Sequence, residues 1–262
     1  MAEEQLALID QLTRPVGASD TQNGVTVTVD SITVGNSNLW LLLKISGEYP
    51  EEENVGYNFS GMDLTIDPDP DQVDTPGGAG LSYPYSGVAE DGRLTLLVHY
   101  TIDLAGQSSL LDEARQVTLL MDDLVCNDMT ESGDQDVTLA EGHWTLTFPL
   151  EPGETGAVLT LEEIQVPAIN RDAQETKEIT LRDVSLTATD LSFYQPVEDQ
   201  NWEPEKCALV LQDGSEVNWS SGTSRFWDEA QTQWGSIWYW QVPVDLSQAA
   251  ALRIGGTEIP LD

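Results

Sequence analysis

Residues 24–47 read GVTVTVDSITVGNSNLWLLLKISG, and this stretch decides the fold class. In its first half valines alternate with threonines, and this period of two is typical of a strand with one buried face. The tetrapeptide GNSN at 35–38 has the composition of a turn, and the apolar residues 39–45 run back from it. The stretch therefore predicts an antiparallel hairpin.

The same period recurs through the rest of the chain. Further strand-like segments lie at 62–66, 93–103, 116–126, 143–150, 157–166, 177–195, 206–211, 216–219, 236–246 and 251–261. Between the two groups, EPGETG at 151–156 has the composition of a linker. We therefore expect an all-β protein of two tandem antiparallel β-sandwich domains of immunoglobulin-like type, residues 1–150 and 151–262.

A short helix is expected at the start of the chain. Leu6, Ile9 and Leu12 recur at helical spacing, acidic residues come early in the segment, and Pro15 ends it. The first domain would then consist of this helix followed by the first sandwich.

The charge is strongly one-sided, with 46 Asp and Glu against 10 Lys and Arg and a formal net charge of -36. Such a surface repels phosphate backbones and anionic lipid, which excludes nucleic acid and an anionic membrane surface as partners. Divalent cations and basic proteins remain possible. Strong like charge also keeps a protein in solution, so we expect a monomer.

Cysteine usage and targeting signals set further bounds. Cys126 and Cys207 fall in different expected domains, so they form neither a disulfide framework nor a metal set. No apolar run approaches the roughly 20 residues that span a bilayer. The opening MAEEQLALID is acidic where a signal peptide is basic. We therefore expect either a cytoplasmic protein or a piece of a longer membrane-anchored or exported protein.

Several phrases resemble a known bacterial family. PVGASDTQNGVTVTVDSITVGNSNLWLLLKISG at 15–47 and HWTLTFPL at 143–150 are similar to the opening and closing strands of an extracytoplasmic domain of unknown function in Gram-positive proteins. EITLRDVSLTATDLSF at 178–193 and WQVPVDLSQAAALRIGGTEIPL at 240–261 are similar to the immunoglobulin-like domain that commonly follows it.

This resemblance covers nearly the whole chain and implies a setting. Proteins of that family typically carry a short cytoplasmic segment and one transmembrane helix before the domain, and some are anti-sigma-type regulators. The resemblance implies an ectodomain at the cell surface, without its anchor and without a sigma-binding segment. We expect a non-catalytic sensing or protein-interaction region whose partner is a protein or a cell-envelope ligand.

No catalytic motif is present in the sequence. The chain contains no G-x-S-x-G turn, no H-E-x-x-H and no glycine-rich phosphate loop, and both histidines, His99 and His143, lie in strand-like segments. We expect no enzyme activity and no cofactor.

The loop DPDPDQVD offers a candidate calcium site. It places Asp67, Asp69, Asp71 and Asp74 close together in one stretch, and oxygen ligands at alternating positions suit a hard cation. The loop lacks the glycine and the final glutamate of an EF-hand. The alternative is a solvated acidic loop.

Tryptophans are concentrated in the second half, where six of the eight lie between 202 and 240. Alternation in 236–242 places Trp238 and Trp240 on a core face and Tyr239 on the other. Trp227 and Trp234 precede this strand and are the candidate ligand contacts. Exposed rings on a sandwich are how carbohydrate modules stack on sugars, so a surface or secreted carbohydrate-binding module is the alternative function. A structural role for the rings is the other alternative.

Overall fold

The computed structural model shows an all-β protein with two compact units. It describes residues 14–48, 55–70, 79–88, 92–102, 104, 109–110, 112–128, 136–151, 158–170, 172–226 and 231–261. Described residues up to 151 form the first unit, and those from 158 onward form the second. The expected N-terminal helix lies outside the described residues. Within them, no helix is long and apolar enough to cross a membrane.

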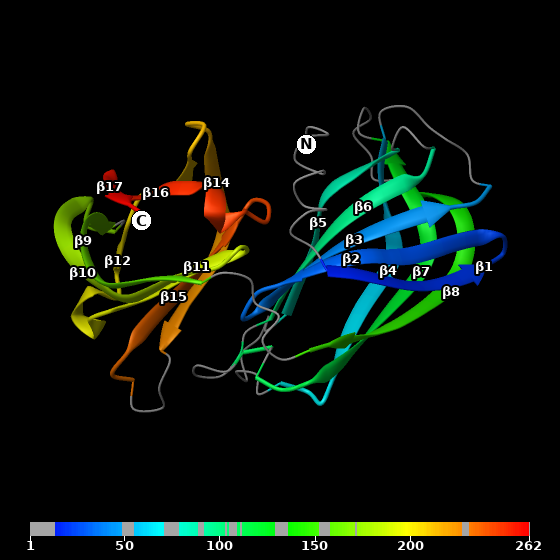
Figure 1. Cartoon of the computed structure of the whole chain (residues 1–262), viewed down its shortest axis with the longest axis horizontal. Coiled ribbons are helices and arrows are strands. Elements are labelled where there is room, and N and C mark those ends of the chain that lie inside the picture. The colour runs from blue at the N-terminus through cyan, green and yellow to red at the C-terminus, as the bar shows by residue number, and fades with distance from the viewer. Residues whose placement is uncertain are drawn as a thin grey trace. The chain divides into compact units, whose positions relative to one another are not determined.

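The first unit consists of two antiparallel sheets (Figure 1). The larger sheet has the order β1-β2-β3-β6-β5 and the smaller has the order β4-β7-β8. The strands of the larger sheet are β1 (Arg14–Gln22), β2 (Val25–Val34), β3 (Asn38–Ser46), β5 (Ala79–Val88) and β6 (Leu94–Ile102). Those of the smaller sheet are β4 (Val55–Asp67), β7 (Arg115–Asp128) and β8 (Asp136–Leu150).

The hairpin expected from residues 24–47 is confirmed. Strands β2 and β3 pair antiparallel, from Val34 opposite Leu39 to Thr26 opposite Ser46. The valines of β2 that alternate with threonines point into the core and are at most 1% exposed. The local pattern therefore specified both the pairing and the buried face.

Strand β8 closes the core of the first unit from the smaller sheet. Its inward side chains are at most 2% exposed, while the residues between them are exposed; they are Trp144, Leu146, Phe148 and Leu150. The indole Nε1 of Trp144 donates a hydrogen bond to the carbonyl oxygen of Val25 at 3.0 Å. This bond joins the two sheets through a residue of each, so the layers form one sandwich.

The second unit is one antiparallel sheet of nine strands in the order β12-β9-β10-β11-β15-β14-β13-β16-β17. Its first strands are β9 (Leu159–Asn170), β10 (Glu175–Leu186), β11 (Asp190–Gln195) and β12 (Trp202–Glu203). The others are β13 (Cys207–Leu211), β14 (Glu216–Phe226), β15 (Trp234–Trp240), β16 (Ala249–Ile254) and β17 (Thr257–Pro260). Two single-turn 3-10 helices, Val197–Asp199 and Leu246–Gln248, lie in connections.

Strand β14 folds this sheet into two layers. Its first residues, 216–218, pair with β13, whereas 219–226 pair with β15. The register shifts between Trp219 and Ser221, which marks a bulge, and bulges bend strands. The apolar faces of β9, β10, β11 and β15 then enclose a core with those of β13 and β16. The tandem-sandwich prediction is confirmed.

Strand β15 departs from its expected pattern. Trp238 and Trp240 are 2% and 0% exposed, so their prediction as core rings is confirmed. Ile237 and Tyr239, on the opposite face, are also buried, at 5% and 4%. Both faces of the strand are therefore buried, whereas alternation predicted one buried face.

Candidate functional site

The core of the second unit ends in a change from apolar to polar side chains. Along the inward face of β15, Trp240 and Trp238 are followed by Ser236 and then by Trp234, which is only partly buried. A serine in the third of these positions interrupts the apolar packing. The inward face of β15 therefore has a polar, partly exposed edge at the start of the strand and becomes core toward its last residue, Trp240.

The neighbouring strands change at the same level. On β11, Phe193 lies opposite Ser236, and Gln195 lies opposite Trp234. On β14, Ser224 also lies opposite Ser236. Three adjacent strands thus place polar side chains side by side where the core ends.

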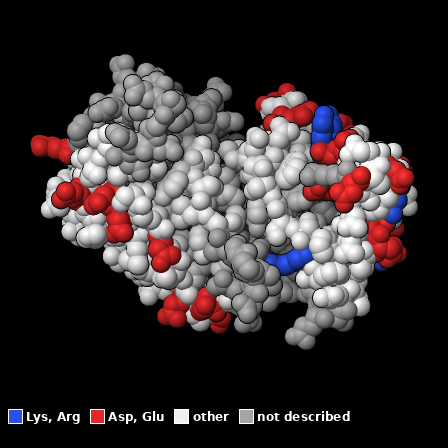
Figure 2. Space-filling view, turned by 180° about the vertical axis from the view of Figure 1, so that it is seen from behind, with Lys and Arg blue, Asp and Glu red and all other residues white. Residues whose placement is uncertain are grey.

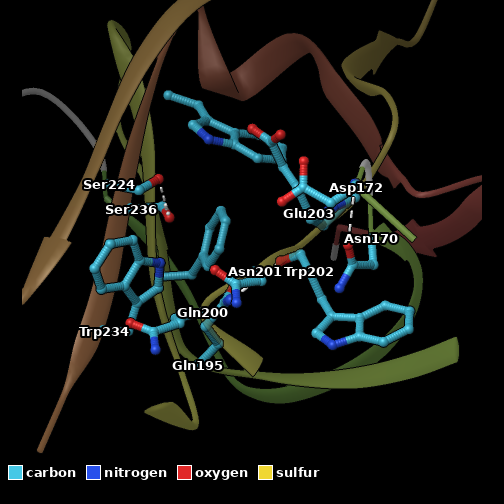
Figure 3. A pocket seen from close by; sticks show the side chains of 13 residues that line it. Asn170, Asp172, Gln195, Gln200, Asn201, Trp202, Glu203, Ser224, Trp234 and Ser236 are labelled. Atoms are coloured by element: carbon cyan, nitrogen blue, oxygen red, sulfur yellow. Dashed lines mark hydrogen bonds between the residues drawn. The ribbon is translucent and has the colours of Figure 1, made fainter. Parts of the chain in front are cut away.

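A groove of about 210 Å³ opens at this place (Figure 3). The described residues that line it are Asn170, Asp172, Phe193, Gln195, Gln200, Asn201, Trp202, Glu203, Pro204, Ser224, Trp234, Ser236 and Trp238. Trp234 and Trp202 lie on opposite sides of the view, with Gln200 and Asn201 between them. Aromatic rings with a few convergent polar groups are the usual composition of a ligand site.

The floor of the groove is held by contacts among the strands. The hydroxyl oxygens of Ser224 and Ser236 are 2.7 Å apart, so these side chains hydrogen-bond to each other. The ring of Trp234 packs edge-on against Phe226, with centroids 5.0 Å apart and an interplanar angle of 82°. The ring of Trp238 packs in the same manner on Phe193 at 5.1 Å. The rings are therefore fixed before any ligand arrives.

The opposite wall comes from the connection between β11 and β12. Gln195, which is 5% exposed, donates from Nε2 to the carbonyl oxygen of Asp199 at 2.6 Å and to that of Trp202 at 3.1 Å. One buried amide thus ties both ends of a four-residue segment to β11. Its nitrogen is used by these bonds, and its oxygen is an acceptor.

Lys177 of β10 adds a second restraint on this wall. Its ammonium group hydrogen-bonds to the carboxylate of Asp199 and lies 4.5 Å from the centroid of the Trp202 ring. A cation over an indole face is attracted to it, so the ring is held in place. The backbone of Trp202 also pairs with Asn170 of β9.

The acidic rim of the groove begins in the turn after β9. The side-chain oxygen Oδ1 of Asn170 accepts hydrogen bonds from the backbone N–H groups of Asp172 and Ala173, both at 3.1 Å. This fixes the turn and leaves the carboxylate of Asp172 exposed at the mouth. Glu203, on β12, brings a second carboxylate to the same groove and is half-buried.

The structure brings one of the two predicted ligand contacts into this groove. Trp234 lines it, whereas Trp227 lies outside the described residues. Sequence reasoning did not select Gln195 or Asn201 as contacts, and it counted Trp202 only as part of the cluster. The signal for Gln195 was present, because a polar residue stands at a position where alternation along β11 requires an inward side chain.

The acidic loop is only half described. Asp67 and Asp69 are exposed, and Asp71 and Asp74 lie outside the described residues. The carbonyl oxygen of Pro68 accepts a hydrogen bond from Arg115, so a guanidinium lies in this loop. Across the described part of the chain, no three His, Cys, Asp or Glu side chains are placed to hold a metal ion. Calcium binding by the four aspartates stays a prediction.

The two histidines have different surroundings. His99 is 5% exposed and stacks on the ring of Trp40, with centroids 4.0 Å apart, and burial lowers its pKa to about 4. His143 is exposed on β8, and its Nδ1 lies 2.6 Å from a carboxylate oxygen of Asp122. This hydrogen bond raises the pKa of His143. A hollow of about 380 Å³ lies beside this pair. Leu120, an apolar side chain that is 42% exposed, is among the residues that line it.

Comparison with known proteins gives one weak similarity. The crystal structure of a conserved domain protein from Bacillus anthracis is similar over 93% of this chain and 77% of its own, with a TM-score of 0.49 and 11% sequence identity. No family model matches the sequence, and no curated protein matches it at a significant level. A similarity at this level identifies neither a family nor a function, so the candidate site rests on its own geometry.

Proposed function

We propose that this chain is a non-catalytic interaction region of an extracytoplasmic, membrane-anchored bacterial protein, and that the groove of the second unit is its ligand-binding site. The observation that carries the proposal is the polar end of the core, where Trp234 is only partly buried among polar neighbours. Folded proteins bury aromatic rings where they can, so a ring left at the edge of a pre-formed groove favours recognition.

The surroundings of the histidines support a non-catalytic role. His99 is held neutral by burial and packs against Trp40, and His143 pairs with an exposed carboxylate on a sheet face. Neither lies in the groove lining as described. Cys126 and Cys207 are both buried and form no disulfide, and burial raises the pKa of the Cys207 thiol, which disfavours a nucleophilic thiolate.

The setting follows from the resemblance of the strand patterns to anchored ectodomains of Gram-positive bacteria, including anti-sigma-type regulators. Its test is the coding sequence upstream of Met1. A transmembrane helix behind a small cytoplasmic segment would support an anchored regulator, whereas a cleavable signal peptide would favour a secreted module.

The groove is tested by NMR of protein labelled with ¹⁵N at tryptophan. Neutral saccharides, neutral peptides and basic peptides are added in turn while the indole signal of Trp234 is followed. The proposal expects at least one class to shift this signal in a saturable manner, and Trp234→Ala to abolish that binding. If every class left the Trp234 signal in place, the groove would not be the binding site.

Carbohydrate binding is the second candidate function. The observation that favours it is the combination of an accessible ring with the amides and hydroxyls of Gln200, Asn201 and Ser224 in one groove. Retardation in gels that contain neutral polysaccharide, lost in Trp234→Ala, would support it. Unretarded migration across the polysaccharides tested would count against it.

A further inference from the structure

The described residues that line the groove include two carboxylates and no basic side chain, and the nearby ammonium group of Lys177 is paired with Asp199 behind Trp202. Asp172 and Glu203 are carboxylates, and the other described lining residues are neutral. Arg171 lies outside the described residues. Figure 3 shows Asp172 and Glu203 on the same side of the groove, across from Trp234. A ligand in this space would therefore have an aromatic ring on one side and carboxylates on the other.

The rest of the protein reinforces this bias. The formal net charge is -36, and Figure 2 shows carboxylates over the described surface of both units with few basic groups among them. A potential of this sign repels anionic ligands and concentrates cations near the surface. This electrostatic potential therefore favours a cationic ligand in the groove over a neutral or an anionic one.

The molecule already contains the contact that such a ligand would make. The ammonium group of Lys177 lies over the ring of Trp202 and binds the carboxylate of Asp199. A cation thus sits between an indole and a carboxylate in the wall of the same groove. Trp234, with Asp172 and Glu203 across from it, offers the same two kinds of partner to a cation from outside.

The size of the groove and its hydrogen-bond acceptors indicate which kind of cation fits it. At about 210 Å³ it is smaller than the roughly 300 Å³ at which pockets for drug-sized ligands begin, so it fits one side chain. Oxygen acceptors are available from the hydroxyls of Ser224 and Ser236 and the amide of Gln195. A guanidinium has five donors in a plane, stacks on indole rings and pairs with carboxylates, whereas an ammonium is a compact point charge.

We propose that the groove binds an arginine side chain of a basic partner protein. This inference rests on the proposed function, since it names the partner chemistry of the same groove. The partner segment is one that presents a single accessible arginine to the space between Trp234 and the carboxylates of Asp172 and Glu203.

The test compares short peptides that differ at one side chain. A Gly-Gly-Arg-Gly-Gly peptide, blocked at both ends, is titrated against the same peptide with lysine or with citrulline, which is neutral and nearly isosteric with arginine. The dissociation constants come from isothermal titration calorimetry, which can be used on every variant, and the indole shift of Trp234 in the unmutated protein shows that the peptide binds in the groove. We expect the order Arg tighter than Lys tighter than citrulline, with added salt weakening only the charged peptides.

Protein variants separate the groove from the overall charge. Asp172→Gln and Glu203→Gln keep the side chains polar, and each should weaken the Arg peptide about two- to fivefold, the range of a partly exposed ion pair. Trp234→Ala should weaken it about tenfold or more, as loss of a central aromatic contact does. The matched control combines Glu162→Gln with Glu178→Gln, two exposed carboxylates outside the groove lining, and should leave the affinity within twofold.

Four outcomes would overturn the inference. Equal affinity for the arginine and citrulline peptides would show that the positive charge is not recognised. Equal losses of affinity in the control and groove variants would show that the peptide binds through the charge of the whole surface and not through the groove. If a neutral saccharide shifted Trp234 and the Arg peptide did not, the groove would remain a binding site for another class of ligand. If neither of these nor a neutral peptide moved the Trp234 signal, the proposed function would fail as well.

Discussion

Strands β8 and β15, one in each unit, both carry fully buried tryptophans, and the last residues of β8 differ from the first residues of β15. On β8 the inward side chains stay apolar to the last residue, Leu150, and the core of the first unit is closed there. On β15 the inward face changes to Ser236 and a partly buried Trp234, and a groove opens. Both strands contribute a buried indole whose Nε1 donates to a backbone oxygen, from Trp144 to Val25 and from Trp240 to Thr187.

The difference shows how one architecture produces either a closed scaffold or a site. Continuous apolar alternation fills the space between two layers and excludes ligands. Ser236 at one inward position leaves that space unfilled. Its hydroxyl hydrogen-bonds to the hydroxyl of Ser224, and the amide of Gln195 donates to the backbone carbonyl oxygens of Asp199 and Trp202. The groove is therefore built by the strands that also build the core, which makes it rigid.

The largest expected effect concerns the feature that the two cores share, a fully buried tryptophan. Trp144→Ala and Trp240→Ala should each lower the free energy of unfolding by about 3–5 kcal/mol, because each removes a fully buried ring and a hydrogen bond. Urea denaturation followed by circular dichroism measures this. A loss below about 1 kcal/mol in either variant would show that its ring is not packed as described.

The first unit also buries a titratable group. The pKa of His99 is lowered from 6.5 to about 4 in the folded state, so its neutral form stabilises the fold. That contribution is fully present above pH 6.5 and is lost as the pH falls toward 4. Between pH 7 and pH 5 we expect wild type to lose about 2 kcal/mol more than His99→Phe. Parallel pH dependence of the two unfolding free energies would contradict a buried, neutral His99.

Gly222 on β14 lies against Trp238, whose ring packs behind the groove, and a substitution there tests this contact. A Cβ at Gly222 would lie 2.5 Å from Cδ1 of Trp238 and 2.6 Å from the carbonyl oxygen of Ile237. Gly222→Ala should therefore cost about 1–2 kcal/mol through displacement of Trp238. Thermal unfolding measures the cost. Gly214→Ala is a poor control, because Gly214 has a positive φ of 85° that alanine rarely adopts. Ser221→Ala on the same strand is the suitable control, and an equal loss there would remove the explanation.

The smallest expected effect on stability separates the groove ring from the core rings. Trp234→Ala should change the free energy of unfolding by less than about 1 kcal/mol, since the ring is partly exposed and its loss leaves no enclosed cavity. The same substitution should weaken binding in the groove about tenfold or more. A cost comparable to that of Trp240→Ala would place Trp234 in the core and remove it from the candidate site.

The sequence predicted most of the fold because alternation is a local signal. The hairpin of β2 and β3 and the core positions of Trp238 and Trp240 both follow from a period of two. Burial of Tyr239 did not follow, because it depends on what covers the second face of β15, and periodicity does not contain that information.

The site was predictable only in part. Trp234 could be selected because it lies outside the apolar segment 236–246 that predicted the strand, although the structure makes it the first residue of β15. The opposite wall comes from Asn170, Asp172 and Trp202, which reach the groove through the pairing of β12 with β9 and the hydrogen bonds of Gln195. Such long-range register is set by tertiary packing and leaves no local pattern to find.

The contrast between sealed and accessible rings is tested most directly by the solvent exposure of individual indoles. Protein labelled with ¹⁵N at tryptophan is mixed with a soluble paramagnetic agent, and the attenuation of each assigned indole signal is measured. We predict strong attenuation for Trp234 and little for Trp144 and Trp240, whose indole N–H groups are buried and hydrogen-bonded. Attenuation of Trp234 no greater than that of Trp240 would contradict an open groove at the end of the second core.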